Sequence, residues 1–255
     1  MYLIDYADRN VLFNKDFNSG RVYLSTGVYG NYVLASCLEM LTRINIESHS
    51  PEGIIYFQND EAGTPVINSQ SGEAYVPLCD DKIVTVDIDR WLITDTTLNA
   101  PWVGCGPTAL FSSSLNSMLL SDGWKNIYRL SIPALACTGT LEFPEVPANM
   151  NLKENDGDIF ISFPDQGLWK ASGSTMSMTT ELFGDETRAV EAVNGTDLLM
   201  IGAGSGIIVI DRNNGEQIDS LSCASPATIL AVSDDGEYCA AVLDSDKTRI
   251  LFFER

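Results

Sequence analysis

The chain has 255 residues, with 35 acidic and 15 basic side chains and a formal net charge of −20. So large a negative charge disfavours direct binding to nucleic acid or to an anionic membrane, because both depend on Lys and Arg to neutralise phosphate groups. It leaves basic or mixed-charge proteins and cations as the partners that electrostatics supports. A chain of this length can bury a sizeable core as one all-β domain.

The N-terminus and the cysteines predict a cytoplasmic protein. Residues 1–10 contain no apolar run behind a basic start, and no long apolar stretch follows elsewhere, so neither a signal peptide nor a membrane span is expected. The six cysteines are scattered without a C-x-x-C pair. We expect them to be mostly buried thiols in a reducing compartment rather than disulfides or zinc ligands.

Short strands separated by polar turns run along the chain, and helical periodicity is nearly absent. Two strands are expected within residues 1–17. Inner strands are then expected at 22–26, 64–68, 108–112, 148–152, 189–193 and 228–232, so their starts lie 39 to 44 residues apart. A period near forty residues with four short strands per unit is typical of a β-propeller.

We therefore predict an all-β fold, a single closed β-propeller domain over residues 1–255 with six four-stranded blades. The blades are expected at about 22–60, 64–99, 108–143, 148–183, 188–223 and 227–255. The sixth ends after its third strand, and we expect the N-terminal strand of residues 1–17 to complete it, which would leave no sheet edge open. A β-sandwich is the alternative, since its strands need no forty-residue register.

The clearest repeat unit lies in residues 195–255 and resembles a known superfamily. The turn Ser233-Asp234-Asp235-Gly236-Glu237-Tyr238 resembles the Ser-x-Asp-Gly-x-x turn of tryptophan–aspartate (WD) repeats and related quinoprotein-like propellers. The strand ending at Asp211, followed by Asn214-Gly215-Glu216, is similar to the strand-Asp and Gly-Glu turn of those repeats. The Gly-His and Trp-Asp dipeptides that name the family are absent. The resemblance implies a scaffold that presents loops to protein or peptide partners, usually without catalysis.

Three segments suggest ligand chemistry but lack the context that this chemistry needs. The glycines of 202–206 lead into a further β-rich run, whereas a dinucleotide site needs a helix N-terminus there. The acidic segment 154–158 lacks the frame of an EF-hand loop. A single histidine, His49, cannot build a His-based zinc site, and no nucleophile-elbow motif lies near it. We expect no cofactor, no metal and no catalytic residue.

The loops between second and third strands are expected to share one end of each blade with the connections between blades. That end carries two tryptophans in polar loops surrounded by carboxylates, which suits a hot spot for a basic partner. Alternatively, both indoles pack over blade edges. The opposite end is also acidic, so charge alone does not select a face. The predicted partner-binding residues are Trp102, Trp124, Asp80, Asp81, Asp122, Asp165, Asp244 and Asp246.

These features predict a non-catalytic protein–protein interaction scaffold, a subunit of a larger complex, whose acidic loops dock a basic or mixed-charge protein. One alternative is a propeller enzyme, a lyase or hydrolase with a carboxylate- or cation-dependent site at the central channel. The acids Asp80, Asp81, Asp87 and Asp89, which are close in sequence, keep that chemistry open. A second alternative is a structural subunit of a viral or other particle.

Overall fold

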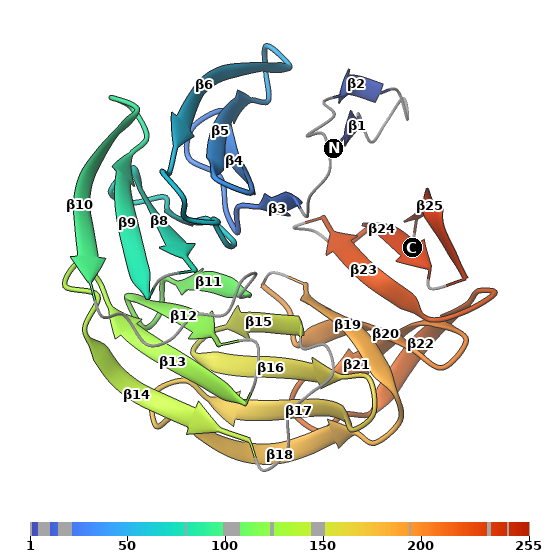
Figure 1. Ribbon diagram of the computed structural model, residues 1–255. Helices are drawn as coiled ribbons and strands as arrows, with labels where there is room; N and C mark the ends of the chain where they lie inside the picture. Colours follow the sequence, from blue (N-terminus) through green and yellow to red (C-terminus); the bar gives the residue numbers. More distant parts are fainter. Residues whose placement is uncertain are drawn as a thin grey trace. The chain divides into compact units, whose positions relative to one another are not determined.

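A computed structural model of the chain describes residues 2–4, 11–14, 22–79, 81–98, 108–122, 125–143, 151–193, 195–233, 236–243 and 245–254. All of the elements in this described part are β-strands (Figure 1). Among these residues we find no helix whose length and apolar character would let it span a bilayer. The chain divides into two compact units, Met1–Glu142 and Phe143–Arg255.

The N-terminal unit holds one two-stranded sheet and three four-stranded blades. The small sheet pairs β1 (Tyr2–Ile4) with β2 (Val11–Asn14). Blade one consists of β3 (Val22–Leu24), β4 (Tyr32–Cys37), β5 (Met40–Asn45) and β6 (Ser50–Tyr56). Blade two consists of β7 (Val66–Asn68), β8 (Glu73–Leu78), β9 (Lys82–Asp87) and β10 (Leu92–Leu98). Blade three consists of β11 (Ala109–Ser112), β12 (Ser117–Ser121), β13 (Asn126–Ser131) and β14 (Cys137–Glu142).

The C-terminal unit holds two four-stranded blades and one three-stranded blade. Blade four consists of β15 (Asn151–Asn155), β16 (Asp158–Phe163), β17 (Gly167–Ser172) and β18 (Ser177–Phe183). Blade five consists of β19 (Thr187–Ala192), β20 (Leu198–Ala203), β21 (Gly206–Asp211) and β22 (Gln217–Ser222). Blade six consists of β23 (Ala227–Val232), β24 (Tyr238–Leu243) and β25 (Asp246–Glu254). Within every blade the strands follow chain order and pair antiparallel.

The predicted all-β fold with six blades is confirmed. The sixth blade has three strands, as predicted. The completion of that blade by the N-terminal strand is not confirmed, because in the described part of the chain β1 and β2 pair only with each other. The two-stranded sheet at 2–14 was predicted as two strands within 1–17, and that prediction is confirmed.

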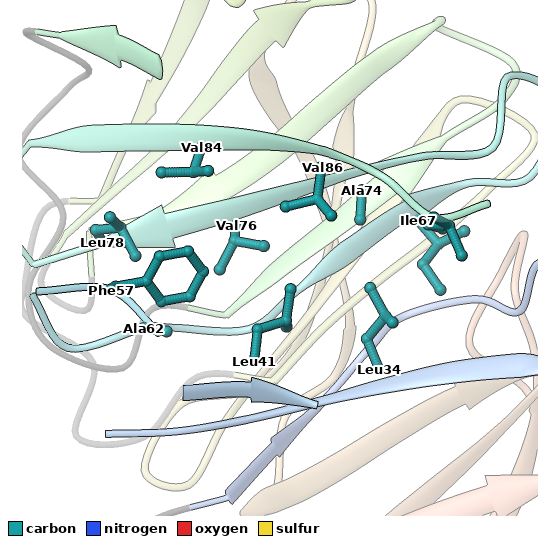
Figure 2. Packing of buried hydrophobic residues seen from close by; sticks show 11 residues of the cluster. Leu34, Leu41, Phe57, Ala62, Ile67, Ala74, Val76, Leu78, Val84 and Val86 are labelled. Carbon is teal, nitrogen blue, oxygen red and sulfur yellow. The ribbon is translucent and has the colours of Figure 1, made fainter. Parts of the chain in front are cut away.

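The core of the N-terminal unit lies between neighbouring blades. Side chains of β8 alternate between two neighbours: Ala74, Val76 and Leu78 pack toward blade one, whereas Tyr75 packs toward blade three. Figure 2 shows the first of these clusters, in which Leu34 and Leu41 of blade one face residues of blade two. A middle strand is therefore apolar on both faces, and its sequence shows an unbroken apolar run instead of alternation.

The C-terminal unit is built in the same way. In β20, Leu199 and Ile201 belong to the cluster shared with blade four, whereas Met200 belongs to the cluster shared with blade six. Close approach of backbones adds to this packing: a Cβ on Gly202 would lie 1.9 Å from the carbonyl oxygen of Ala227, the first residue of blade six. Gly202 is thus a glycine because the backbone of β23 occupies the space of a side chain.

An arginine fastens blade one to blade two. The guanidinium carbon of Arg43 in β5 lies 4.7 Å from the ring centre of Tyr32 and 5.1 Å from that of Trp91, which follows β9. The same guanidinium donates to the backbone carbonyl of Ile88. A guanidinium between two rings combines cation–π attraction with stacking, which Lys does not reproduce.

The cysteines in the described part of the chain are free thiols. Cys37 and Cys239 are buried, whereas Cys137 is exposed. Burial, together with the nearby carboxylate of Glu191, raises the pKa of the Cys239 thiol to about 11. The Cys239 thiol is therefore protonated and unreactive near neutral pH.

Candidate functional site

The loops between second and third strands share one end with the connections between blades, as expected. In the N-terminal unit, Ala62 of the connection donates its backbone N–H to the carbonyl of Leu38 in the β4–β5 loop (2.8 Å). In the C-terminal unit, Cys223 of a connection donates to the carbonyl of Ser205 in the β20–β21 loop (2.7 Å). We call this end of each unit its loop end.

The structure describes three of the predicted partner-binding residues fully, and all three lie at the loop ends. Asp81 lies in the β8–β9 loop, Asp122 follows β12, and Asp165 lies in the β16–β17 loop. Asp246 is the first residue of β25, but its side chain is outside the described part. The other predicted residues lie outside the described residues; these are Trp102, Trp124, Asp80 and Asp244.

Asp122, one of the predicted partner-binding residues, is buried in the structure. Its residue is only 4% exposed. Asn126 donates both its backbone N–H (3.1 Å) and its side-chain amide (2.7 Å) to the Asp122 carboxylate. The Asp122 side chain thus binds Asn126, the first residue of β13, through both of its carboxylate oxygens.

The remaining loop-end acids are more accessible. Glu39, Glu61 and Asp165 are exposed, and Asp81 is half-buried with a left-handed backbone (φ 55°). Lys82 offsets part of this charge, since its ammonium lies 3.0 Å from the carboxylate of Asp60. The N-terminal loop end therefore keeps a surplus of negative charge.

The basic side chains that the structure describes, which exclude those of Lys247 and Arg249, are all engaged within the chain. Arg43 lies between aromatic rings, and Arg129 donates to Thr138. The others form salt bridges within their own unit; these are Lys82, Arg90, Lys125, Lys153, Lys170, Arg188 and Arg212. Such exposed pairs add little stability, but they leave the surplus carboxylates without a described cation of the chain itself.

The segments whose ligand chemistry was rejected from sequence serve as turns. The glycines at 202–206 connect β20 to β21 in a hairpin, with no helix beside them. In the acidic segment, Asp156 pairs with Arg212 and Asp158 pairs with Lys170. Asp89 accepts a hydrogen bond from Tyr29 (3.0 Å), which raises the pKa of that phenol. Among the described residues no group of three His, Cys, Asp or Glu side chains is arranged to hold a metal ion.

Sequence reasoning missed a groove between blades five and six, which we call the inter-blade groove. Its volume is about 130 Å³, and an adjoining hollow of about 240 Å³ shares Ile207, Ser220 and Leu221 with it. The groove is lined by Met200, Ile207, Val209, Asp219, Ser220, Leu221, Gly236, Glu237, Cys239, Phe253 and Glu254. The only sequence signal for it is the strand β22, where Ile218 and Leu221 interrupt a polar outer strand.

No family model matches the sequence, and no curated protein matches it. Three solved structures are similar over most of their length. The hydrazine synthase of Kuenenia stuttgartiensis aligns with a TM-score of 0.71 at 10% identity, covering 91% of this chain and 76% of that chain. The WD40 domain of Neurospora crassa Pan2 aligns at 0.69 and 13%, covering 83% and 69%. A chain of a mitotic checkpoint complex aligns at 0.72 and 12%, covering 95% and 82%.

The fold is that of a WD-repeat-like β-propeller. At these identities the likeness concerns the fold and names no subfamily. In the two segments that resemble WD repeats, Asp211 accepts the backbone N–H of Asn213 (2.7 Å), and Ser233 accepts that of Tyr238 (3.0 Å). The WD-repeat-like fold is thus held at its turns by short side chains that accept backbone N–H groups.

Proposed function

We propose that this WD-repeat-like propeller is a non-catalytic protein–protein interaction scaffold that docks a basic or mixed-charge partner on its loop ends. One observation carries the proposal: the described basic side chains are all engaged within the chain, whereas Glu39, Glu61 and Asp165 at the loop ends are exposed and pair with no described base. A partner that supplies Lys or Arg would complement this charge and associate faster at low salt.

The similar structures support a role in protein assembly. One is a WD40 domain, and another is a chain of a complex. Blades of this kind hold their loops on rigid strands, so that loop side chains are presented without reorganisation on binding. We extend the interaction surface to Trp102 and Trp124, whose indoles would supply the apolar anchors that acidic loops lack.

The test compares partner recovery by matched charge variants of the full chain. Glu39→Lys combined with Asp165→Lys reverses one exposed acid at each loop end. Glu47→Lys combined with Glu216→Lys makes the same change in charge at the opposite ends, in the β5–β6 and β21–β22 turns. Each protein is immobilised, exposed to an extract of the source cells, and washed at 50 and 300 mM salt.

We expect the loop-end variant to recover at least five-fold less of a partner than the wild type and the opposite-end variant do. The wash at 300 mM salt should release that partner. Trp102→Ala with Trp124→Ala should cause a loss of similar size. Equal recovery by both charge variants would refute the docking of a partner at the loop ends.

The catalytic alternative has one observation in its favour, the likeness of its fold to hydrazine synthase. Its metal-dependent form predicts that EDTA lowers the melting temperature and that purified protein contains a stoichiometric metal. The scaffold predicts no EDTA shift. Mass spectrometry for metals combined with a thermal melt separates the two.

A further inference from the structure

We propose that the inter-blade groove is a second docking site, which binds an extended protein segment carrying one large apolar side chain flanked by Lys or Arg. The proposal rests on the proposed function as an interaction scaffold and adds a surface with its own chemistry. It starts from the space between β22 of blade five and β24–β25 of blade six.

The groove has a buried apolar base. Met200, Ile207, Val209 and Cys239 are each no more than 6% exposed. The Cys239 thiol is protonated, so it adds no charge to this base. A volume of about 130 Å³ is close to that of an apolar cavity that takes up a benzene ring. The base therefore suits a large apolar side chain better than a polar one, whose hydrogen-bonding groups would lose water without finding partners.

The end of β22 at Leu221 is uncovered, unlike the end of the equivalent outer strand of blade four, β18. In β18, Leu182 is 8% exposed, and its carbonyl oxygen lies 2.0 Å from the place where a Cβ on Gly215 would be, so the β21–β22 turn of blade five covers it. In β22 every residue is exposed, with Ile218 at 50% and Leu221 at 39%. Exposed apolar side chains beside a groove are a feature of interaction sites.

The negative charge around the groove favours a segment that carries positive charge. Asp219, Glu237 and Glu254 line it and are exposed. Asp219 and Glu254 form no ion pair with any basic residue of the described part; Asp219 accepts the backbone N–H of Ser220 (2.8 Å). An apolar ligand without a cation would strip water from these carboxylates, whereas Lys or Arg beside the anchor would replace that water with an opposite charge.

The adjoining hollow favours a segment in an extended conformation. It continues along β22 to Ser222 and reaches Gly204, Ser205 and Gly206 in the β20–β21 loop. This is the second-to-third-strand loop that carries no carboxylate. An apolar hollow followed by a polar, glycine-lined one fits a chain of several residues, with one side chain as its anchor.

The test uses fluorescein-labelled heptapeptides and fluorescence anisotropy with the full-length protein. The probe has the core Arg-Phe-Arg between Gly and Ser residues. Two control peptides change one property each: Arg-Ser-Arg removes the apolar anchor, and Glu-Phe-Glu reverses the flanking charge. We expect the probe to bind at least ten-fold more tightly than either control peptide.

The matched protein variants make the same change in charge at two places. Asp219→Lys with Glu254→Lys should weaken binding of the probe at least ten-fold. Glu181→Lys with Asp185→Lys, on exposed residues of β18 and the connection after it, should leave binding within two-fold. If the first variant does not fold, Asp219→Asn with Glu254→Gln should still weaken binding at least three-fold.

Two results would overturn the proposal. One is equal binding of the three peptides, or of the probe to both charge variants. The other is that the probe binds but removes the hydrogen-exchange protection of β1 and β2, because the groove would then be a site for the chain's own N-terminal strands. The loop-end variant Glu39→Lys with Asp165→Lys should bind the probe as the wild type does, so failure at the groove and failure at the loop ends are separate outcomes.

Discussion

Replacing Gly202 with Ala tests whether backbone contact between blades five and six sets the stability of the C-terminal unit. The new Cβ would lie 1.9 Å from the Ala227 carbonyl oxygen, where ordinary contact begins at 3.4 Å, so the two backbones must part by about 1.5 Å (3.4 − 1.9). Overpacking of this kind costs about 3 kcal/mol when backbone has to move. Loss of glycine freedom in the unfolded chain returns about 0.5–1 kcal/mol. The net destabilisation is therefore about 2–2.5 kcal/mol.

Gly204→Ala is the matched control, two residues away in the same hairpin. Its Cβ would meet nothing within 4 Å, but its backbone is left-handed, with a φ of 55°. That conformation costs an Ala residue about 1–2 kcal/mol, less the same entropic gain, or about 1 kcal/mol net. The pair thus separates close approach from backbone conformation.

The assay is thermal unfolding of both variants, followed by near-UV circular dichroism. For a chain of this size, each kcal/mol lowers the melting temperature by about 2–4 °C. We expect a decrease of about 5–10 °C for Gly202→Ala and about 2–4 °C for Gly204→Ala. Equal decreases would refute the argument that the β23 backbone fills the side-chain space at Gly202.

Arg43→Ala should lower the free energy of unfolding, measured in urea, by about 2–3 kcal/mol, because two aromatic rings and a carbonyl lose their contact with a cation. Arg43→Lys should restore less than half of this loss. For Cys239, the folded pKa of about 11 exceeds the reference value of 9.0, so the unfolded state loses its proton first and stability should fall between pH 9 and 11. The decrease should not exceed about 3 kcal/mol; Cys239→Ala should remove this part of the pH dependence, and Cys137→Ser should keep it. If the protein is a particle subunit, light scattering should find a closed oligomer.

The blades could be predicted from sequence because their middle strands are buried on both faces. Runs such as 73–78 and 198–203 are almost continuous in apolar residues and end at polar turns, so a strand can be expected at each of them. The inner strand of blade four was expected at 148–152, but β15 runs from Asn151 to Asn155. Asp156 and Gly157 both have positive φ, which forms a two-residue hairpin turn and brings polar residues into the ladder.

The candidate sites were predictable only in part. The carboxylates of the second-to-third-strand loops follow from the repeat, so Asp81 and Asp165 could be placed from sequence alone. The burial of Asp122 could not, because it depends on Asn126 folding back onto the carboxylate. The inter-blade groove joins residues from β20 to β25 that share no motif, and its walls exist only once two blades pack side by side.

The middle strands, which are buried on both faces, also determine how a destabilising change in one blade affects the blades beside it. Within the N-terminal unit, blade two uses Val76 to bind blade one and Tyr75 to bind blade three. Adjacent positions in one strand therefore contribute to different interfaces. As in a linear repeat array, the stability of each blade depends on the blades next to it. Deleting blade two would uncover apolar surface on both of the blades beside it. An insertion in this protein is consequently best tolerated in a loop, and an added or lost blade would have to be matched at two interfaces at once.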